Sequence, residues 1–183
     1  MNSADAEQLL FADTLVCDDE FPVTVRPAHD HQECLDCARR AEVTLRALAS
    51  VEESHTEEAD PAEHVNARIE AKLDLAFALL AMIASHQRPP PPVRRVRWSR
   101  LGLRVAVAEP LAPAAAVVVS ACLLSGFPLP VDLPLEVLAC ESSDHGFDVW
   151  LRIPEYAPAV RTGIERELFR HHRRLIAERR SAR

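Results

Sequence analysis

The residues whose types and spacing come closest to a metal site are His31, Cys34 and Cys37, with His29 two positions upstream. A structural zinc ion takes four nitrogen or sulfur ligands, and a Cys-x-x-Cys pair is usually joined by a second pair at a defined distance. Cys34 lies instead on the apolar stripe of a predicted helix. The other cysteines are isolated in the sequence, at Cys17, Cys122 and Cys140. We therefore interpret Cys34 and Cys37 as core thiols and predict no metal and no cofactor.

Residues suited to acid–base catalysis are also present, but they lack partners. His171 and His172 lie among arginines, and the sequence identifies neither an orienting carboxylate nor a nucleophile for them. Glu165 and Glu167 point in different directions on a helix, which makes them a poor acid–base pair. The four glycines are scattered, so no glycine-rich phosphate loop can form. We predict no catalytic site and no enzyme activity.

A cluster of arginines offers a second kind of chemistry, the binding of phosphate groups or stacking on bases. Its members are Arg88, Arg94, Arg95, Arg97 and Arg100. The alternative is that these arginines pair with the acidic helical half, in the same chain or in another subunit. The net charge of −7 favours this alternative over the binding of long nucleic acids.

The elements that position these residues fall into two halves of opposite charge. Residues 1–86 carry 18 acidic and six basic side chains, whereas residues 87–183 carry ten acidic and 15 basic ones. The length of 183 residues suits one domain with an attachment, or two small domains. No apolar run reaches the roughly 20 residues of a membrane span, and the N-terminus lacks the features of a secretory signal. We expect a cytoplasmic protein with reduced thiols and no membrane insertion.

Two helices are predicted in the acidic half, at 31–52 and 61–86. In the second, apolar residues recur at heptad spacing with an asparagine at one position, giving the seam Asn66, Ile69, Leu73, Ala76, Leu80 and Ile83. Such a seam is typical of a coiled coil, in which a buried asparagine fixes register and oligomer state. The alternative is a helical hairpin within one chain. Because two helices alone make a thin core, we predict that this segment self-associates.

The period of the apolar residues changes after Pro89 to Pro92, which end the second helix. Four strands are predicted at 101–109, 114–124, 130–142 and 146–153, with Val131 to Ala139 alternating so that odd-numbered residues share one face. The strands are too closely spaced for crossover helices, which indicates an antiparallel sheet or small barrel. A basic helix follows at about 158–180. Residues 1–30 favour a short hairpin or extended arm, because Pro22 argues against a central strand position.

The order of these elements, with Ser99 and Gly102 at a turn that enters a strand, resembles the PilZ domain over about residues 93–180. The final helix contributes to the resemblance through its end, Leu168-Phe169-Arg170-His171-His172-Arg173-Arg174. The resemblance implies a six-stranded barrel that in bacteria commonly binds cyclic di-GMP. Two strands remain to be placed, for which Val93–Trp98 and part of 1–30 are candidates. The added acidic helices resemble the atypical, tetrameric branch of the family.

The expected fold is therefore α+β: a small antiparallel six-stranded PilZ-like β-barrel with a C-terminal helix, preceded by long coiled-coil-forming helices. This divides the chain into four parts. They are an N-terminal arm or hairpin (1–30), a helical oligomerisation segment (31–87), a proline-rich joint (88–92), and the barrel with its helix (93–183).

Nucleotide-binding PilZ domains use an Arg-x-x-x-Arg loop before the barrel and an Asp/Asn-x-Ser-x-x-Gly motif on an early strand. Ser99 and Gly102 match the second motif, but Arg97 stands at its Asp/Asn position. Arginine has no acceptor for the N–H groups of guanine. The spacing of the first motif is not met by Arg88, Arg94 and Arg95. We predict that Ser99 and Gly102 are vestigial and that no nucleotide site of the usual kind forms.

The function that these patterns predict is that of a non-enzymatic signalling adaptor, self-associating as a homo-oligomer, with a tetramer favoured. It would act through an unidentified signalling or motility protein, without binding cyclic di-GMP or nucleic acid. Motility, pili and virulence are processes that the resemblance implies. The alternative is a receptor that binds cyclic di-GMP, another nucleotide or RNA through its arginines in a non-standard mode.

Overall fold

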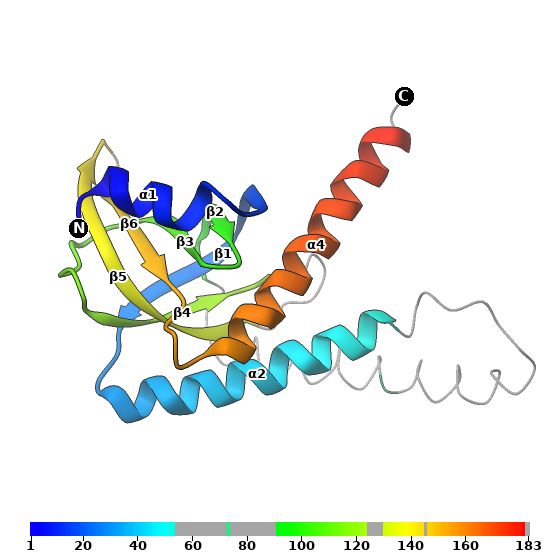
Figure 1. Cartoon of the computed structure of the whole chain (residues 1–183), viewed down its shortest axis with the longest axis horizontal. Helices are drawn as coiled ribbons and strands as arrows, with labels where there is room; N and C mark the ends of the chain where they lie inside the picture. The colour runs from blue at the N-terminus through cyan, green and yellow to red at the C-terminus, as the bar shows by residue number, and fades with distance from the viewer. Residues whose placement is uncertain (54–72, 74–90, 124–129, 145, 182–183) are drawn as a thin grey trace, which may run out of the picture.

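The computed structural model describes residues 1–53, 73, 91–123, 130–144 and 146–181. Within these ranges, six strands and three labelled helices follow one another in chain order (Figure 1). They are α1 (Ser3–Phe11), β1 (Val16–Pro27), α2 (His31–Glu53), β2 (Val93–Ser99), β3 (Gly102–Val107), β4 (Ala116–Ala121), β5 (Val131–Ser143), β6 (Gly146–Arg152) and α4 (Pro158–Ser181). The six antiparallel strands and the C-terminal helix agree with the expected fold.

The strands pair in the order β1-β2-β3-β6-β5-β4, and β4 returns to β1, so that the sheet closes into a barrel. Strand β1 makes this closure because its first half pairs with β2 and its second half with β4. Pro22 lies where β1 changes partner: Pro22 pairs with Val93 of β2, and the next residue, Val23, pairs with Ala121 of β4. The Pro22 carbonyl still accepts a hydrogen bond from the Cys122 N–H (3.0 Å).

The N-terminal 30 residues are not a separate arm or hairpin, but they do supply one of the two barrel strands that remained to be placed, and Val93–Ser99 supplies the other. Residues 1–30 hold helix α1 and one long strand, β1, which is part of the barrel rather than a separate segment. Pro22 did not exclude a strand because a proline is tolerated where its missing N–H is not needed for the ladder. The barrel therefore takes strands from both sides of the acidic helical segment, whereas the expected division started it at residue 93.

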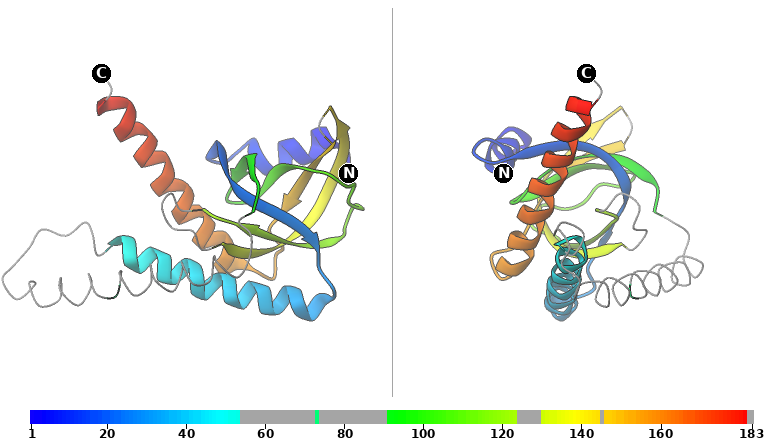
Figure 2. Two further views of the ribbon diagram at one scale, coloured as in Figure 1. Left: turned by 180° about the vertical axis from the view of Figure 1, so that it is seen from behind. Right: turned by 90° about the vertical axis from the view of Figure 1, so that its right-hand side faces the viewer.

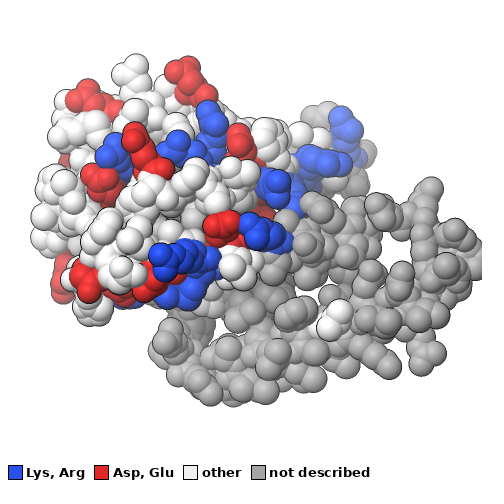
Figure 3. All heavy atoms as spheres, turned by 60° about the horizontal axis from the view of Figure 1, so that its bottom comes forward, with Lys and Arg blue, Asp and Glu red and all other residues white. Residues whose placement is uncertain are grey.

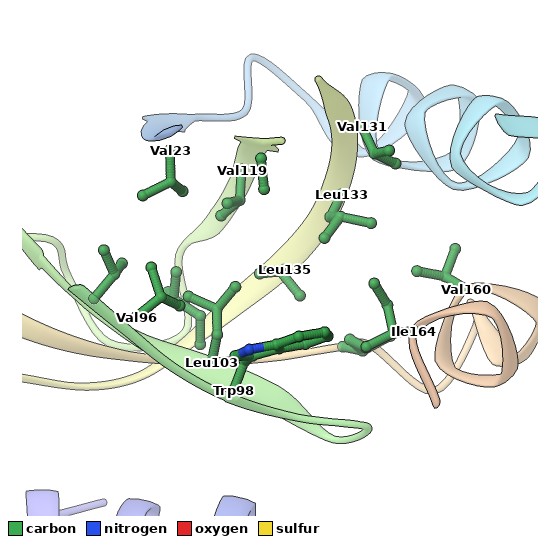
Figure 4. Close-up of a cluster of buried hydrophobic side chains, with 14 of the residues drawn as sticks. Val23, Val96, Trp98, Leu103, Val119, Val131, Leu133, Leu135, Val160 and Ile164 are labelled. Carbon is green, nitrogen blue, oxygen red and sulfur yellow. The ribbon is translucent and has the colours of Figure 1, made fainter. Parts of the chain in front are cut away.

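The barrel interior is filled by alternating valine and leucine side chains from all six strands, together with Trp98 (Figure 4). Strand β5 contributes Val131, Leu133 and Leu135 to this core. A bulge between Val137 and Ala139 then shifts the register against β6. Ala139 consequently faces a second, outer cluster, so the predicted inward face is wrong at this residue. One extra residue is enough to turn the following side chain to the opposite face, since side chains alternate between the two faces of a strand.

Helices α2 and α4 pack together at one end of the barrel, while α1 lies against its outer side (Figure 2). The start of α2 is fixed by a capping arrangement. The Asp30 carboxylate accepts from the Glu33 N–H, and the Glu33 carboxylate accepts from the His29 N–H, both at 2.7 Å. Gly163 of α4 lets the two helices approach closely, because a Cβ there would lie 2.7 Å from Leu45 Cδ1.

The predicted second helix and its seam lie outside the described residues, apart from Leu73. That residue is helical, and its side chain is 51% exposed in the single chain. Among the described residues, no helix has the length and apolar character needed to cross a membrane.

Candidate functional site

The turn between β2 and β3 carries Ser99 and Gly102, which pair with each other across the hairpin. Ser99 is only 1% exposed. Its hydroxyl donates to the Leu10 carbonyl of α1 at 2.7 Å and accepts from the Leu101 N–H at 3.1 Å. A hydroxyl has one proton to donate, so this contact commits the Ser99 donor to α1.

Gly102 is required by the packing of the strands themselves. A Cβ at this position would lie 2.0 Å from the carbonyl oxygen of Leu151 and 2.9 Å from the Cα of Arg152, both in the backbone of β6. Only a residue without a Cβ permits this approach of β3 to β6. The glycine of the motif thus has a structural reason that is independent of any ligand.

Arg97 lies on β2 with its side chain turned outward, toward α1. Its Nε is 3.3 Å from Glu7 Oε1, its Nη1 is 3.5 Å from Asp18 Oδ2, and its guanidinium carbon lies 5.2 Å from the centre of the Phe11 ring. Both the charge and the planar face of Arg97 are therefore engaged within the chain.

Glu7 is the residue on which this site converges, and its role was not predicted from the sequence. Its carboxylate forms an ion pair with Arg97 and accepts hydrogen bonds from the Trp150 indole N–H at 2.7 Å and from Arg104 Nη1 at 3.3 Å. Arg104 also lies over the Trp150 ring, 5.8 Å from its centre. The available signal was the N-cap Asn2, whose side chain accepts from the Asp5 N–H, followed by a short amphipathic helix.

The remaining arginines of the cluster are distributed rather than gathered into one site. Arg94 donates to the Ala106 carbonyl at 2.9 Å, Arg100 lies 3.7 Å from the Glu165 carboxylate, and Arg95 is exposed. Arg88 lies outside the described residues. The expected pairing with the acidic half holds for Arg97, whose partners Glu7 of α1 and Asp18 of β1 lie within residues 1–86. Arg100 lies instead beside Glu165 of α4, in the basic half. On the face drawn in Figure 3, acidic and basic side chains are interspersed.

The Cys-x-x-Cys pair lies in the interface between α2 and the barrel. Cys34 and Cys37 are both buried, and the Cys37 thiol donates to the Asp132 carbonyl at 3.3 Å. Burial, with the nearby Asp132 charge, raises the pKa of the Cys37 thiol to about 12. His31 lies edge-to-face against Tyr156, with ring centres 5.6 Å apart. In the described ranges, no group of three or more histidine, cysteine, aspartate or glutamate side chains could hold a metal ion.

His171 and Glu167 connect α4 to its surroundings. His171 Nε2 lies 2.6 Å from the Asp19 carboxylate of β1, and the His171 ring is 6.0 Å from the Trp98 ring. Glu167 is buried and pairs with Arg170 one turn further along the helix, at 2.9 Å. An apolar cavity lined by Trp98, Leu135 and Ile164, among others, has a volume of about 10 Å³. That space is on the scale of one water molecule and is too small for a nucleotide.

The sequence matches the family described as "Atypical PilZ domain, cyclic di-GMP receptor" over residues 45–181. The chain is also similar to a solved structure of a pathogenic protein from Xanthomonas campestris, described as a new tetrameric PilZ domain self-assembled via an unusual helical bundle. The two are 31% identical with a TM-score of 0.81, over 96% of this chain and 97% of that one. No curated protein matches the sequence. Together, the closed six-stranded sheet, the C-terminal helix and these matches show that the chain belongs to the atypical PilZ family.

Proposed function

We propose that this protein is a non-enzymatic PilZ-family adaptor that self-associates and acts through a protein partner, without binding cyclic di-GMP in the usual manner of the family. The observation that carries the proposal is the use of the motif residues within the chain. The Ser99 hydroxyl donates to α1, and Arg97 is paired with Glu7 and Asp18.

The chemistry of guanine recognition supports the absence of the usual nucleotide contact. The Watson–Crick edge of guanine presents N–H donors, which a carboxylate or amide oxygen accepts, whereas a guanidinium group can only donate. The nearest carboxylate, Glu7, already receives the indole N–H of Trp150 and lies against two arginines. A guanine base that reached the Ser99 hydroxyl would have to displace α1, to which that hydroxyl donates, and Glu7 would leave with the helix.

Self-association rests on the seam Asn66, Ile69, Leu73, Ala76, Leu80 and Ile83. Support comes from the similar Xanthomonas campestris protein, which is described as a tetramer assembled through a helical bundle. In one chain, Leu73 is helical and half exposed. Burial of such a leucine against other subunits removes apolar surface from water and stabilises the assembly.

The test is a calorimetric titration with cyclic di-GMP on protein whose mass is measured in parallel by light scattering. We expect no saturable binding in the micromolar range and a mass above that of one chain. Micromolar or tighter binding that Arg97→Ala abolishes would overturn the proposed absence of nucleotide binding. A monomeric mass at working concentration would overturn self-association, independently of the nucleotide result.

A second candidate function, a nucleotide or RNA receptor with an unusual binding mode, is favoured by the family's description as a receptor. The exposed Arg95 is the first residue to test, because the described residues give it no ion pair. Phosphate-dominated binding weakens steeply as salt concentration rises. Binding that falls with salt and is reduced by Arg95→Ala would support the receptor; the adaptor predicts no binding at any salt concentration.

A further inference from the structure

Helix α1 lies against the outer side of the barrel and packs on the outer hydrophobic cluster (Figure 1). The surface that it covers combines two positive charges, an indole N–H, a hydroxyl and an apolar floor. We call this surface the α1 dock and define it by Arg97, Ser99, Arg104, Leu138, Ala139 and Trp150.

The helix presents complementary groups at a fixed spacing. Glu7 offers one carboxylate to Arg97, Arg104 and the Trp150 N–H, while Leu10 and Phe11 enter the outer cluster. Residues three and four positions apart lie on the same face of a helix, so the pattern Glu-x-x-Leu-Phe brings charge and apolar groups to the dock together. Leu9, on the opposite side, is 50% exposed.

The helix is held by the dock and has little stability of its own. It has nine residues, and isolated helices shorter than about 12–15 residues are marginal in water. A short tether, Ala12 to Leu15, joins it to β1. The apolar contacts of α1 are with the outer cluster, which is separate from the inner cluster that fills the barrel, so we expect this helix to open locally without unfolding the barrel.

We propose that the α1 dock is a docking site for an amphipathic helix of a partner protein, one that carries a carboxylate followed three and four residues later by two apolar side chains. Helix α1 occupies the dock in cis, and the partner helix replaces it. Charge complementarity selects an acidic helix, since the dock places two guanidinium groups and an N–H donor around one carboxylate position. This inference rests on the proposed adaptor function and deepens it by naming the chemistry of the partner.

The cis helix sets the affinity that a partner helix would show. A partner binds only those molecules in which α1 has left the dock, so its apparent affinity falls by the fraction of open molecules. A variant that keeps α1 undocked should therefore bind a free helix peptide more tightly than the unaltered chain does. If fewer than about 10% of molecules are open, the gain is about tenfold or more.

Hydrogen exchange on the unaltered chain tests whether α1 opens independently. We expect the α1 amides to exchange through local opening, well before those of the barrel strands. Exchange of α1 amides only together with the barrel core would overturn the proposal, because the helix would then be an integral part of the fold.

The binding test compares two full-length variants of adjacent leucines. Leu10→Asp places a charge in the dock and should release α1, whereas Leu9→Asp changes an exposed position and serves as the matched control. The probe is a fluorescent peptide of residues 1–13, followed by anisotropy, with tryptophan fluorescence to monitor the barrel. We expect the peptide to bind Leu10→Asp about tenfold or more tightly than Leu9→Asp, and Arg104→Glu added to Leu10→Asp should remove this binding.

Three outcomes would overturn the docking site. Equal peptide affinity in the two leucine variants would mean that α1 does not compete for the dock. Loss of the barrel fold in Leu10→Asp would make α1 structural. Binding of cyclic di-GMP to Leu10→Asp, without binding of the peptide, would identify a covered nucleotide site. Failure of the adaptor function itself is distinguishable, since it would appear as nucleotide binding by the unaltered chain.

Discussion

Gly102→Ala is expected to destabilise the barrel strongly, even though it adds a single methyl group. The new Cβ would lie 2.0 Å from the Leu151 carbonyl oxygen, where carbon and oxygen in contact are normally about 3.3 Å apart. The obstacle is backbone, so no side-chain rotation relieves the clash. Strand β6 would have to move by more than about 1 Å away from the turn at Ser99.

The expected loss is about 2–4 kcal/mol in the free energy of unfolding. Overpacking of this kind costs about 1–3 kcal/mol. Movement of β6 also weakens nearby hydrogen bonds, such as that from the Ile153 N–H to the Leu101 carbonyl (2.8 Å), at about 1 kcal/mol each. In the opposite direction, alanine lowers the conformational entropy of the unfolded chain, which stabilises the folded state by about 0.4–1 kcal/mol. The free energy of unfolding of a small domain is about 5–15 kcal/mol, so we expect the variant to fold with reduced stability.

Urea unfolding followed by tryptophan fluorescence measures this loss as a lower midpoint at unchanged slope. The matched control is Gly163→Ala, in which the same methyl group meets the Leu45 side chain and not backbone. At Gly163, a small shift of the two helices relieves the clash. The higher helix propensity of alanine, about 1 kcal/mol, offsets the cost of that shift. If Gly102→Ala is as stable as the unaltered protein, or loses no more than Gly163→Ala, the structural reason given for this glycine is wrong.

Three further predictions concern the assembly, the capping arrangement and the buried thiols. Leu73→Glu combined with Leu80→Glu should reduce the mass in light scattering to that of one chain, because unpaired charges are costly to bury, while Leu9→Glu should leave it unchanged. Glu33→Gln should destabilise the protein at pH 7, since the Arg26 and His29 contacts lower the pKa of Glu33 to about 2. That difference in urea midpoint should shrink as the pH falls from about 4.5 to 2 and vanish below; a difference that persists in acid would contradict this assignment. Cys37, with a pKa of about 12, should resist iodoacetamide at pH 8 in the folded protein and react in urea, and rapid labelling of the native thiol would argue against its burial.

The strands after the prolines could be predicted because alternation of apolar residues is a local signal. The structure places β3, β5 and β6 within two residues of the expected ends. What alternation cannot reveal is a bulge, and Leu138 is the extra residue that turns Ala139 outward. Strand β1 was harder to recognise. Its two halves have different partners, and Pro22 at the exchange interrupts a pattern that would otherwise be continuous.

The candidate site could also be predicted only in part, because only its local spacing is visible in the sequence. Ser99, Gly102 and Arg97 were found through their spacing, and the missing acceptor followed from the chemistry of arginine alone. The partners of Ser99 and Arg97 on α1, Leu10 and Glu7, however, lie about 90 residues earlier in the chain. A nine-residue helix gives a weak sequence signal, and nothing local connects Glu7 with Trp150. Long-range pairing of charges depends on the closed fold and therefore required the structure.

The arginine at position 97 and helix α1 are best understood together. An aspartate at this position, as in nucleotide-binding members of the family, would stand beside Glu7 and Asp18 and repel both carboxylates. A positive residue at the motif position therefore favours docking of α1 through Glu7, and the same residue offers no acceptor to the N–H groups of guanine. Arg97 is thus both the basis of the proposed absence of the usual nucleotide contact and one of several contacts that hold α1.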